Sequence, residues 1–318
     1  MHPSSERFAR DRYGSRPVVG LVVDRVDWHA RELIEALSAR GVETVPVRLH
    51  RCGIATTDGT GLHIDGFGQT VPDAVVVRTM SGGTFEAVTL RLGVLHALRE
   101  LGVTVWNDAR TIEHCVDKSM TSFLLARAGI PTPSTWAMES YEQARAVVEC
   151  EAVAGPLVLK PLFGSQGRGL MLIRSAEDLP QVEQTAGRVF YLQRFIGAEQ
   201  SDGYHDFRLL VVQGRVIAAM RRHSSHWITN IKRGGRPVAV AVNDEMKTLA
   251  LRAAAAVGAN FVGVDIVYGP DDRPTVLEVN SMPAWSGLQK VTSMNIASAF
   301  ADALTAVLAA RGSRGAMA

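Results

Sequence analysis

The sequence predicts an α/β protein with more than one domain, and three observations carry this prediction. Short apolar runs alternate with helical periodicity over about the first 110 residues, a glycine-rich loop links two strand-like runs at 164–169, and the last third of the chain returns to paired strands. Strands that alternate with helices are typical of a parallel sheet covered on both faces. At roughly 150 residues per domain, the 318 residues correspond to two or three domains.

Composition narrows the class of protein. Hydrophobic residues make up 47% and charged residues 21% of the chain, a globular mixture that excludes disorder over most of its length. The 34 basic and 32 acidic residues give a net charge of +2, which argues against a dedicated nucleic-acid binder. The longest run without a charged residue, Ala253–Val264, is shorter than the roughly 20 residues of a membrane span.

The termini and the cysteines add to this description. Residues 1–16 are polar, lack the apolar segment of a secretory signal, and are expected to form a disordered tail. The isolated Cys52, Cys115 and Cys150 have no CxxC spacing, which favours a reducing compartment and gives no zinc site. We therefore expect a cytoplasmic protein with no membrane partner.

The first predicted domain spans residues 17–112. A 3.6-residue period that ends at a glycine predicts each helix, and apolar runs bounded by turn formers predict the strands. The strands are expected at Val18–Val23, Thr44–Leu49, Ala74–Arg78 and Val103–Trp106, and the helices at Trp28–Arg40 and Thr84–Leu101. Residues 63–70 hold several turn formers and are expected to be a hairpin or loop.

Two further regions follow by the same reasoning. The region 113–188 is expected to hold helices at Thr111–Ala128 and Tyr141–Ala154 and strands at Pro156–Pro161 and Leu170–Ile173. The region 189–310 is expected to hold strands at Tyr191–Ile196, Phe207–Gln213, Val216–Met220, Phe261–Tyr268 and Thr275–Val279, with helices at Glu245–Val257 and Ile296–Ala310. Residues 311–318 form a polar tail.

The glycine-rich loop 164–169 is the first candidate for chemistry. Glycines let backbone N–H groups approach a phosphate, and Lys160 on the preceding strand can supply positive charge. An ordinary hairpin turn also selects glycines, so the loop alone leaves both interpretations open. The loop joins two strands, whereas dinucleotide-binding and Walker-type motifs join a strand to a helix. These two classes of nucleotide-binding protein are therefore disfavoured.

A set of oxygen-bearing side chains near the C-terminal end is the second candidate. Asp265 interrupts an apolar strand, where an unpaired carboxylate is costly. Glu278 and Asn280 are two residues apart on the next strand, so they share a face. Two carboxylates and an amide suit Mg²⁺, although edge residues bonded to the backbone would leave the same pattern.

A basic stretch over 221–236 is the third candidate. Clustered positive charge beside Gly234 and Gly235 suits an anionic substrate or a transferring phosphoryl group, and a solvated surface loop is the alternative. A nucleic-acid patch is disfavoured because Trp227 is the only interleaved aromatic residue. His223 and His226 form an HxxH pattern without a neighbouring third ligand, so no zinc site is expected.

The fixed order of these features resembles the ATP-grasp superfamily, and specifically its RimK-like branch of α-L-glutamate ligases. The resemblance covers residues 74–308 and is most detailed at Leu124–Ile130, Gly164–Gly167 and Asn230–Gly235. It implies an ATP-grasp fold, in which an N-terminal parallel-sheet (pre-ATP-grasp) domain precedes two α+β subdomains that clamp a nucleotide.

The resemblance also implies site residues. Contacts to ATP would come from Lys118, Lys160, Gly164, Ser165, Gln166, Gly167, Gly169, Gln193, Phe195, Ile196, Asp206 and Arg208. Asp265, Glu278 and Asn280 would hold one or two Mg²⁺ (or Mn²⁺) ions. Arg221 and Arg233 would stabilise charge on the reacting group, with Asn230 supporting their loop. Arg78 would anchor a substrate carboxylate, and Trp285 would line the acceptor pocket and stack on a ring.

The activity implied by this resemblance is an ATP-dependent ligation of a carboxylate to an amine through an acyl phosphate. We expect L-glutamate as the amine and a small-molecule carboxylate as the acceptor, with a pterin- or furan-type one-carbon coenzyme as the favoured class. Ligation to a protein C-terminus, of a ribosomal or amino-group carrier protein, and a catalytically silent nucleotide-binding protein remain open as alternatives. Relatives suggest a homo-oligomer, either a dimer or a tetramer.

Overall fold

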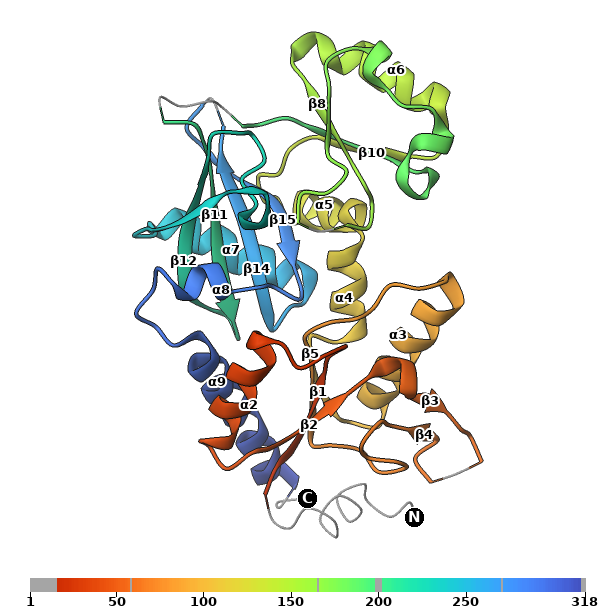
Figure 1. The fold of residues 1–318 in the computed structure, drawn as a ribbon, viewed down its shortest axis with the longest axis vertical. Helices are drawn as coiled ribbons and strands as arrows, with labels where there is room; N and C mark the ends of the chain where they lie inside the picture. Colours follow the sequence, from red (N-terminus) through yellow and green to blue (C-terminus); the bar gives the residue numbers. More distant parts are fainter. Residues whose placement is uncertain (1–15, 58, 165, 198–201, 270, 316–318) are drawn as a thin grey trace.

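A computed structural model describes residues 16–57, 59–164, 166–197, 202–269 and 271–315 of the chain. The described part folds around three main sheets (Figure 1). The tail expected over 1–16 lies outside the described residues, except for Arg16.

The N-terminal sheet is parallel throughout, as predicted. Its strands follow the order β2-β1-β5-β6, with all neighbours parallel. The elements of this region are β1 (Val18–Val22), α2 (Trp28–Ser38), β2 (Glu43–Val47), the 3-10 turn Leu49–Arg51, β5 (Ala74–Val77), α3 (Phe85–Glu100) and β6 (Thr104–Trp106). A short antiparallel pair, β3 (Gly53–Ile54) and β4 (Leu62–His63), was not predicted, and the expected hairpin or loop over 63–70 is a turn closed by an antiparallel bridge between Ile64 and Gly68. Asp27 and Thr84 cap the starts of α2 and α3 by accepting backbone N–H groups.

The helix expected over Thr111–Ala128 is instead two helices, α4 (Ala109–Val116) and α5 (Lys118–Arg127). The break is at Asp117, which has extended backbone angles and accepts hydrogen bonds from the N–H groups of Ser119 and Met120. The side chain of an N-cap aspartate accepts hydrogen bonds from the free N–H groups at the start of a helix, so a second helix can begin at this point. The break makes Lys118 the first residue of α5.

The central subdomain is an antiparallel sheet, β7-β10-β8-β9, covered by one long helix. Its elements are β7 (Thr135–Met138), α6 (Tyr141–Glu151), β8 (Leu157–Lys160), β9 (Met171–Ile173) and β10 (Phe190–Arg194), with four 3-10 turns, Ala152–Ala154, Ala176–Asp178, Val182–Gln184 and Ala186–Arg188. It has its own buried core, in which Val148, Leu157, Phe190 and Leu192 pack together.

The C-terminal sheet is antiparallel with the order β13-β12-β11-β14-β15. Its elements are β11 (Tyr204–Val212), β12 (Arg215–Ser224), the 3-10 turn Ile231–Arg233, β13 (Arg236–Ala239), α7 (Asp244–Val257), β14 (Phe261–Tyr268), β15 (Pro274–Asn280), α8 (Ser286–Gln289) and α9 (Ile296–Gly315). Apolar residues of α7 pack on one face of this sheet, against Leu209, Val262 and Val264.

Two of the predicted boundaries are wrong. The boundary between residues 188 and 189 assigned β10 to the C-terminal subdomain, whereas β10 pairs with β7 and β8 in the central sheet. The order of the strands along the chain does not show that β10 pairs with the earlier strands β7 and β8. The polar tail expected from residue 311 is also wrong in part, because α9 continues to Gly315.

The N-terminal domain and the C-terminal sheet share one core. Leu33 of α2, Phe261 of β14 and Phe300 of α9 belong to the same buried cluster. An ion pair between Arg40 and Asp302, 2.6 Å, joins α2 to α9 at the rim of this core. Helix α9 thus lies beside α2 although about 260 residues separate them (Figure 1).

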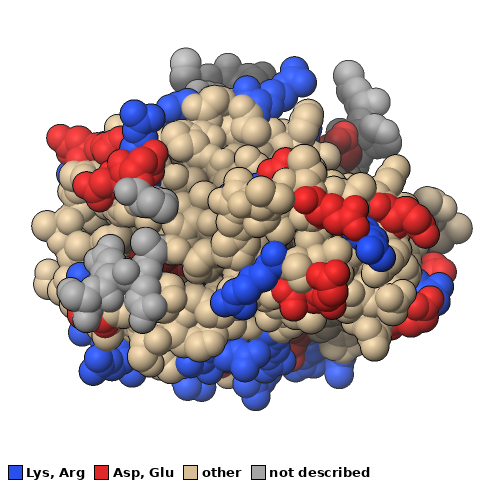
Figure 2. Space-filling view, turned by 90° about the horizontal axis from the view of Figure 1, so that it is seen from above, with Lys and Arg blue, Asp and Glu red and all other residues tan. Residues whose placement is uncertain are grey.

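Acidic and basic side chains are interspersed on the face shown in Figure 2, with basic ones more frequent along its lower edge. This agrees with the small net charge of +2. Among the described residues, no helix combines the length and apolarity that crossing a membrane requires.

Candidate active site

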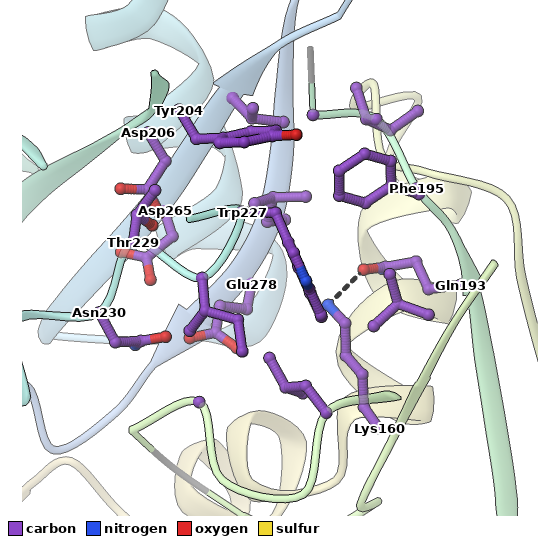
Figure 3. Close-up of a pocket in the computed structure, with 18 of the residues that line it drawn as sticks. Lys160, Gln193, Phe195, Tyr204, Asp206, Trp227, Thr229, Asn230, Asp265 and Glu278 are labelled. Atoms are coloured by element: carbon purple, nitrogen blue, oxygen red, sulfur yellow. Dashed lines mark hydrogen bonds between the residues drawn. The ribbon is translucent and has the colours of Figure 1, made fainter. Parts of the chain in front are cut away.

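A cleft of about 960 Å³, including its open mouth, lies between the central and C-terminal sheets. Strands β8 and β10 and the glycine-rich loop form one wall, and β11, β12, β14 and β15 form the other. Figure 3 shows Lys160 and Gln193 on the first wall and Asp206, Asp265 and Glu278 on the second. Most of the residues predicted to bind a nucleotide, with Asp265 and Glu278 of the predicted metal set, therefore come together from both sheets.

Two lysines project toward the floor of the cleft. Lys160, the last residue of β8, donates from Nζ to Oε1 of Gln193, 2.5 Å. Lys118 donates from Nζ to the carbonyl oxygens of Leu162, 3.2 Å, and Gly164, 2.8 Å. Burial lowers the pKa of both ammonium groups, and the carboxylate of Glu278 opposes that shift. Anionic oxygens of a substrate would stabilise both charges.

A buried network of two arginines and two aspartates supports the opposite wall, where Arg222, Asp206 and Asp265 line the cleft and Arg208 does not. Arg222 donates from Nε to Oδ1 of Asp206, 2.7 Å, and from Nη2 to Oδ2 of Asp265, 2.9 Å. Arg208 donates to both carboxylate oxygens of Asp265, 2.7 and 2.6 Å. Burial alone would raise the pKa of Asp265, but the two guanidinium groups outweigh it and hold that pKa well below its usual range. Asp265 is therefore ionised and fixed in orientation.

Glu278 and Asn280 lie beside this network on β15. Asn280 donates from Nδ2 to Oε1 of Glu278, 3.0 Å, and Glu278 makes no ion pair within the described part of the chain. Asp265 and Glu278 are directly paired across β14 and β15. Two carboxylates and an amide present the hard oxygen donors that Mg²⁺ prefers. The donor chemistry at this place fits Mg²⁺.

The glycine-rich loop touches the basic segment across the cleft. An atom built at the Cβ position of Gly167 would lie 2.6 Å from Oδ1 of Asn230 and 2.7 Å from Ile228. Arg233 donates from Nη2 to the carbonyl oxygen of Gly167, 3.4 Å. The backbone of the loop therefore lies directly against side chains of the Ile228–Arg233 segment. Only glycine at residue 167 leaves room for this close approach. Gly164, Gln166 and Gly167 line the cleft, Gly169 follows in the same loop, and Ser165 lies outside the described residues.

Aromatic rings surround the other end of the cleft. Phe195 and Trp227 are 5.8 Å apart between ring centroids in an edge-to-face arrangement. Figure 3 shows Trp227 pointing into the space between the two walls, with Tyr204 above it. Gln193, Phe195 and Ile196 line the cleft where β10 leads toward β11, with Gln193 between the aromatic rings and Lys160. The arrangement presents flat apolar surfaces that suit a planar ring.

Arg221 does not lie in the cleft, which corrects one of the sequence-based assignments. It pairs with Phe207 across β11 and β12 and lines a separate cavity with Tyr268 on the face that α7 covers. Because side chains alternate along a strand, the neighbouring Arg222 takes the place on the cleft face. Arg233 and Asn230 do lie at the cleft.

A second pocket adjoins the first. Its volume is about 1310 Å³, including its open mouth, and both pockets are lined by Lys118, Lys160, Gly164 and Glu278. Its far part lies against the N-terminal domain and is lined by Arg78, Thr79 and Met80. The two pockets therefore meet at the lysines and the Glu278 carboxylate.

Arg78 is a buried cation in this second pocket. Its residue is 5% exposed, and no described residue forms a hydrogen bond with its Nε or Nη1. The guanidinium carbon lies 4.5 Å from the ring centroid of Trp285. Burial lowers the pKa of Arg78 to about 10, so the group remains protonated at neutral pH. An unpaired buried guanidinium is suited to bind a carboxylate.

Trp285 differs from its expected role of stacking on a substrate ring. It is 1% exposed and packs in the shared core against His29 and Phe261. His29 accepts hydrogen bonds from the backbone N–H groups of Trp285 and Ser286. The indole supports Arg78 from behind and does not line the pocket.

Comparison with known proteins agrees with this architecture. Residues 115–304 match the family model of the RimK-like ATP-grasp domain, and the chain belongs to that family. It is thus an ATP-grasp ligase, a class of enzyme that forms amide bonds.

Individual relatives are similar over nearly the whole chain. A tetrahydromethanopterin:alpha-L-glutamate ligase of Methanosarcina acetivorans is 30% identical, over 90% of this chain and 98% of its own. A probable alpha-L-glutamate ligase of Maridesulfovibrio salexigens is 30% identical over 86% and 90%, respectively. The solved structure of the ATP-grasp ligase PsnB, complexed with a variant of its minimal precursor, Mg and ADP, is 25% identical with a TM-score of 0.71, over 91% of this chain and 98% of that one.

Sequence reasoning missed Arg222 and gave Trp227 no role in the site. A buried arginine between two aspartates leaves no pattern that separates it from its neighbour Arg221. Trp227 did leave a signal, because it is a large apolar residue within the polar 221–236 stretch.

Proposed function

We propose that this enzyme uses ATP and Mg²⁺ to join the amino group of L-glutamate to a carboxylate of a small-molecule acceptor that carries a ring system. The observation that carries the proposal is the meeting of two pockets at Lys118, Lys160 and Glu278. One pocket has the chemistry for a nucleotide, and the other contains an unpaired guanidinium.

The first pocket suits ATP along its whole length. The aromatic end at Phe195 and Trp227 suits the adenine ring, and the lysines with the glycine-rich loop suit the phosphates. This orientation puts the terminal phosphate at the junction, beside the second pocket. PsnB, which shares the fold, is complexed with Mg and ADP.

The chemistry at the junction has two steps. A carboxylate oxygen of the acceptor attacks the γ-phosphorus, the bond to the bridging oxygen breaks, and ADP leaves with that electron pair. The amine nitrogen of glutamate then attacks the acyl carbon, phosphate leaves, and the nitrogen loses a proton. Neither step needs a covalent enzyme nucleophile, so positioning of the partners and charge stabilisation contribute most.

Side chains of this protein have distinct tasks in these steps. Lys118 and Lys160 bind phosphate oxygens and offset their charge, and Arg233 stabilises the developing charge from the opposite wall. The glycine-rich loop excludes water, which would otherwise hydrolyse the acyl phosphate. Asp265, Glu278 and Asn280 would hold Mg²⁺, which when bound would supply positive charge to offset the phosphates.

The substrate assignment is supported by the relatives and by Arg78. The relatives at 30% identity are named as ligases of α-L-glutamate, one of them acting on tetrahydromethanopterin. Arg78 lies in the pocket where a second anion must bind, and a glutamate or acceptor carboxylate would satisfy its free N–H groups. A pterin-type coenzyme is therefore the first acceptor class to test.

An ADP-release screen tests the proposal. The purified enzyme is supplied with Mg-ATP, L-glutamate and a panel of pterin, deazaflavin-type, furan and short C-terminal peptide acceptors, and products are identified by mass. We expect ADP release only when glutamate and one small-molecule acceptor are both present, with a product heavier by whole glutamyl units.

Two variants make this test specific. Glu278→Gln is expected to lower turnover by at least about 100-fold, since loss of one electrostatic stabiliser costs roughly 10²–10³ in rate. Glu149→Gln, at an exposed ion pair on α6, is expected to match the wild type. Turnover with peptides alone would replace the acceptor assignment, and near-normal activity of Glu278→Gln would remove the assigned site.

A further inference from the structure

The structure holds a second cluster of metal-binding side chains, at the end of β11 and β12 that lies beside the mouth of the nucleotide cleft. Asp202, His205 and His223 each offer one ligand atom, and these atoms lie within 4.8 Å of one another. No other such group of three His, Cys, Asp or Glu residues occurs in the described part of the chain. The Mg²⁺ ligands Asp265, Glu278 and Asn280 are not among its members.

The contacts within the cluster bring its three members together from two strands and a turn. His205 Nε2 lies 2.6 Å from Oδ1 of Asp202, and His223 Nε2 bonds the carbonyl oxygen of Asp202. The imidazole rings of His205 and His223 are 5.0 Å apart between centroids and tilted by 33°. They are paired directly across β11 and β12, so the sheet register fixes their separation.

The burial of His205 is the independent observation that points to a ligand. Its side chain is 4% exposed, and among the described residues Nδ1 has no hydrogen-bond partner. Because nothing there fixes the tautomer through Nδ1, the proton can sit on Nδ1 and Nε2, which faces Asp202, can offer its lone pair to a cation. Asp202, in contrast, is 55% exposed, so the cluster combines a rigid buried imidazole with a carboxylate open to solvent.

We propose that Asp202, His205 and His223 form a binding site for one transition-metal ion of the Zn²⁺ class, separate from the Mg²⁺ site of the reaction. Two imidazoles and a carboxylate suit Zn²⁺, whereas Mg²⁺ prefers oxygen ligands alone. Tetrahedral ligands at about 2.1 Å from zinc lie about 3.4 Å apart, so a small contraction of the cluster brings it to that spacing. The exposed side of Asp202 leaves the fourth position to water.

An ion at this place would fix the shape of the nucleotide cleft. His205 lies between Tyr204 and Asp206, which line the cleft, and His223 follows Arg222, which bonds Asp206 and Asp265. Metal binding would tie the turn at Asp202 to both strands. The inferred role is therefore structural support of the wall that carries Asp206 and Arg222.

Arg236 gives the site a distinctive property. Its Nη2 lies 3.3 Å from Nδ1 of His223. When Nε2 of a neutral imidazole binds a metal, Nδ1 carries the proton, and this guanidinium can no longer donate to it. Arg236 must move away as metal binds, so Arg236→Ala is expected to bind Zn²⁺ as tightly as the wild type or more tightly.

Zinc binding to the full chain tests the proposal. The protein is stripped with chelator, kept in excess Mg²⁺ to saturate the oxygen site, and titrated with Zn²⁺ against a chromogenic chelator. We expect one Zn²⁺ per chain, and visible absorption bands of a four- or five-coordinate ion when Co²⁺ replaces it. His205→Ala and His223→Gln are each expected to weaken binding by more than about 100-fold, since even an outer-shell partner contributes about 10- to 100-fold.

The controls separate this cluster from other histidines and guard against misfolding. His226→Ala removes the other half of the HxxH pattern, and His63→Ala removes an exposed histidine of β4. Both are expected to bind Zn²⁺ like the wild type. Asp202→Asn, at an exposed position that leaves the core intact, is expected to weaken binding at least tenfold even where the histidine variants unfold. Absence of one-to-one binding by the wild type, or unchanged binding in Asp202→Asn and both histidine variants, would overturn the proposal.

Discussion

At the scale of single residues, the guanidinium of Arg78 is the group whose environment departs most from what a folded protein prefers. It is buried over Trp285, and two of its nitrogens have no hydrogen-bond partner in the part of the chain that the structure describes. Removing such a group from the interior relieves an uncompensated desolvation cost. Arg78 therefore costs stability in the free enzyme, and a bound carboxylate would restore its hydrogen bonds.

The Arg78→Met variant is expected to bind substrate more weakly without losing stability of the fold. The KM for the substrate whose carboxylate it binds should rise by roughly 10- to 100-fold, because a hydrogen bond to a charged group contributes about 1.5–3 kcal/mol. The KM for ATP should stay nearly unchanged, and the melting temperature should stay level or rise. Steady-state kinetics with each substrate varied in turn, together with thermal unfolding, measure this. Arg99→Met, at an exposed ion pair, is the control. A melting temperature that falls by many degrees would contradict the assigned role.

The carboxylate of Asp265 leads to a prediction of how the free energy of unfolding changes as the pH falls. Arg208 and Arg222 outweigh burial and lower its pKa in the folded state, so it adds stability above its unfolded pKa, near 3.8. That contribution is lost as the pH falls from about 4 toward the folded pKa. Asp265→Asn is expected to lower the free energy of unfolding by about 3–5 kcal/mol at pH 7, and the difference from wild type should shrink below pH 4.

Urea unfolding of both proteins between pH 7 and pH 3 checks this expectation. Glu149→Gln, which alters an exposed pair, should show the same pH dependence as the wild type. A difference between Asp265→Asn and wild type that grows with acidity would show that the sign of the pKa shift is wrong.

Residue chemistry was more predictable from the sequence than residue orientation. Lys118, Lys160, Asp265 and Glu278 converge on one cleft, as their types and order indicated. Whether Arg221 or Arg222 lies in the cleft depends on which face of β12 each side chain occupies. Two consecutive arginines lack the alternation of apolar and polar residues that would identify the buried face. The prediction that Trp285 lines the pocket is wrong. Its burial results from packing with residues of α2 and α9, which the sequence alone does not show.

At the scale of secondary-structure elements, the site depends on two irregular segments. The break between α4 and α5 puts Lys118 at a helix start, from which its side chain reaches the carbonyl oxygen of Gly164. The glycine-rich loop in turn contacts Asn230 and Arg233 from the other wall. The regular strands were predictable from apolar runs, whereas the break at Asp117 was not, since the helical period continues through it.

Gly167→Ala tests the contact between the loop and the opposite wall. The added methyl group would lie 2.6 Å from Oδ1 of Asn230, at a residue with φ of +66°, so the loop must move away. The KM for ATP is expected to rise at least tenfold, while the melting temperature falls only slightly. Gly187→Ala has nearly the same φ, +68°, but no atom of the described residues lies within 4 Å of the added methyl group. It therefore controls for backbone strain of about 1 kcal/mol. Equal KM values in the two variants would mean that the loop does not close against Asn230.

At the scale of the whole molecule, the described residues form two packing units around the cleft. The N-terminal domain and the C-terminal sheet share the core that contains Phe300, while the central sheet has a separate core around Phe190. The sequence predicted three regions but not that the N-terminal and C-terminal ones share a core. That core depends on the contact between α9 and α2, which are about 260 residues apart in the chain. The proposed nucleotide cleft lies between the two units, lined by the central sheet on one side and the C-terminal sheet on the other.

Paired core truncations test this division. Phe300 contacts Trp106 and Phe261, so Phe300→Ala is expected to cost about 3–5 kcal/mol and to loosen the N-terminal and C-terminal sheets together. Phe190→Ala removes a ring of similar burial and is expected to loosen the central sheet alone. Hydrogen exchange followed by mass spectrometry measures this as faster exchange in β1 and β14 for the first variant and in β8 and β10 for the second. Faster exchange across all three sheets in both variants would mean that the chain unfolds as one unit, which would contradict the division into two packing units.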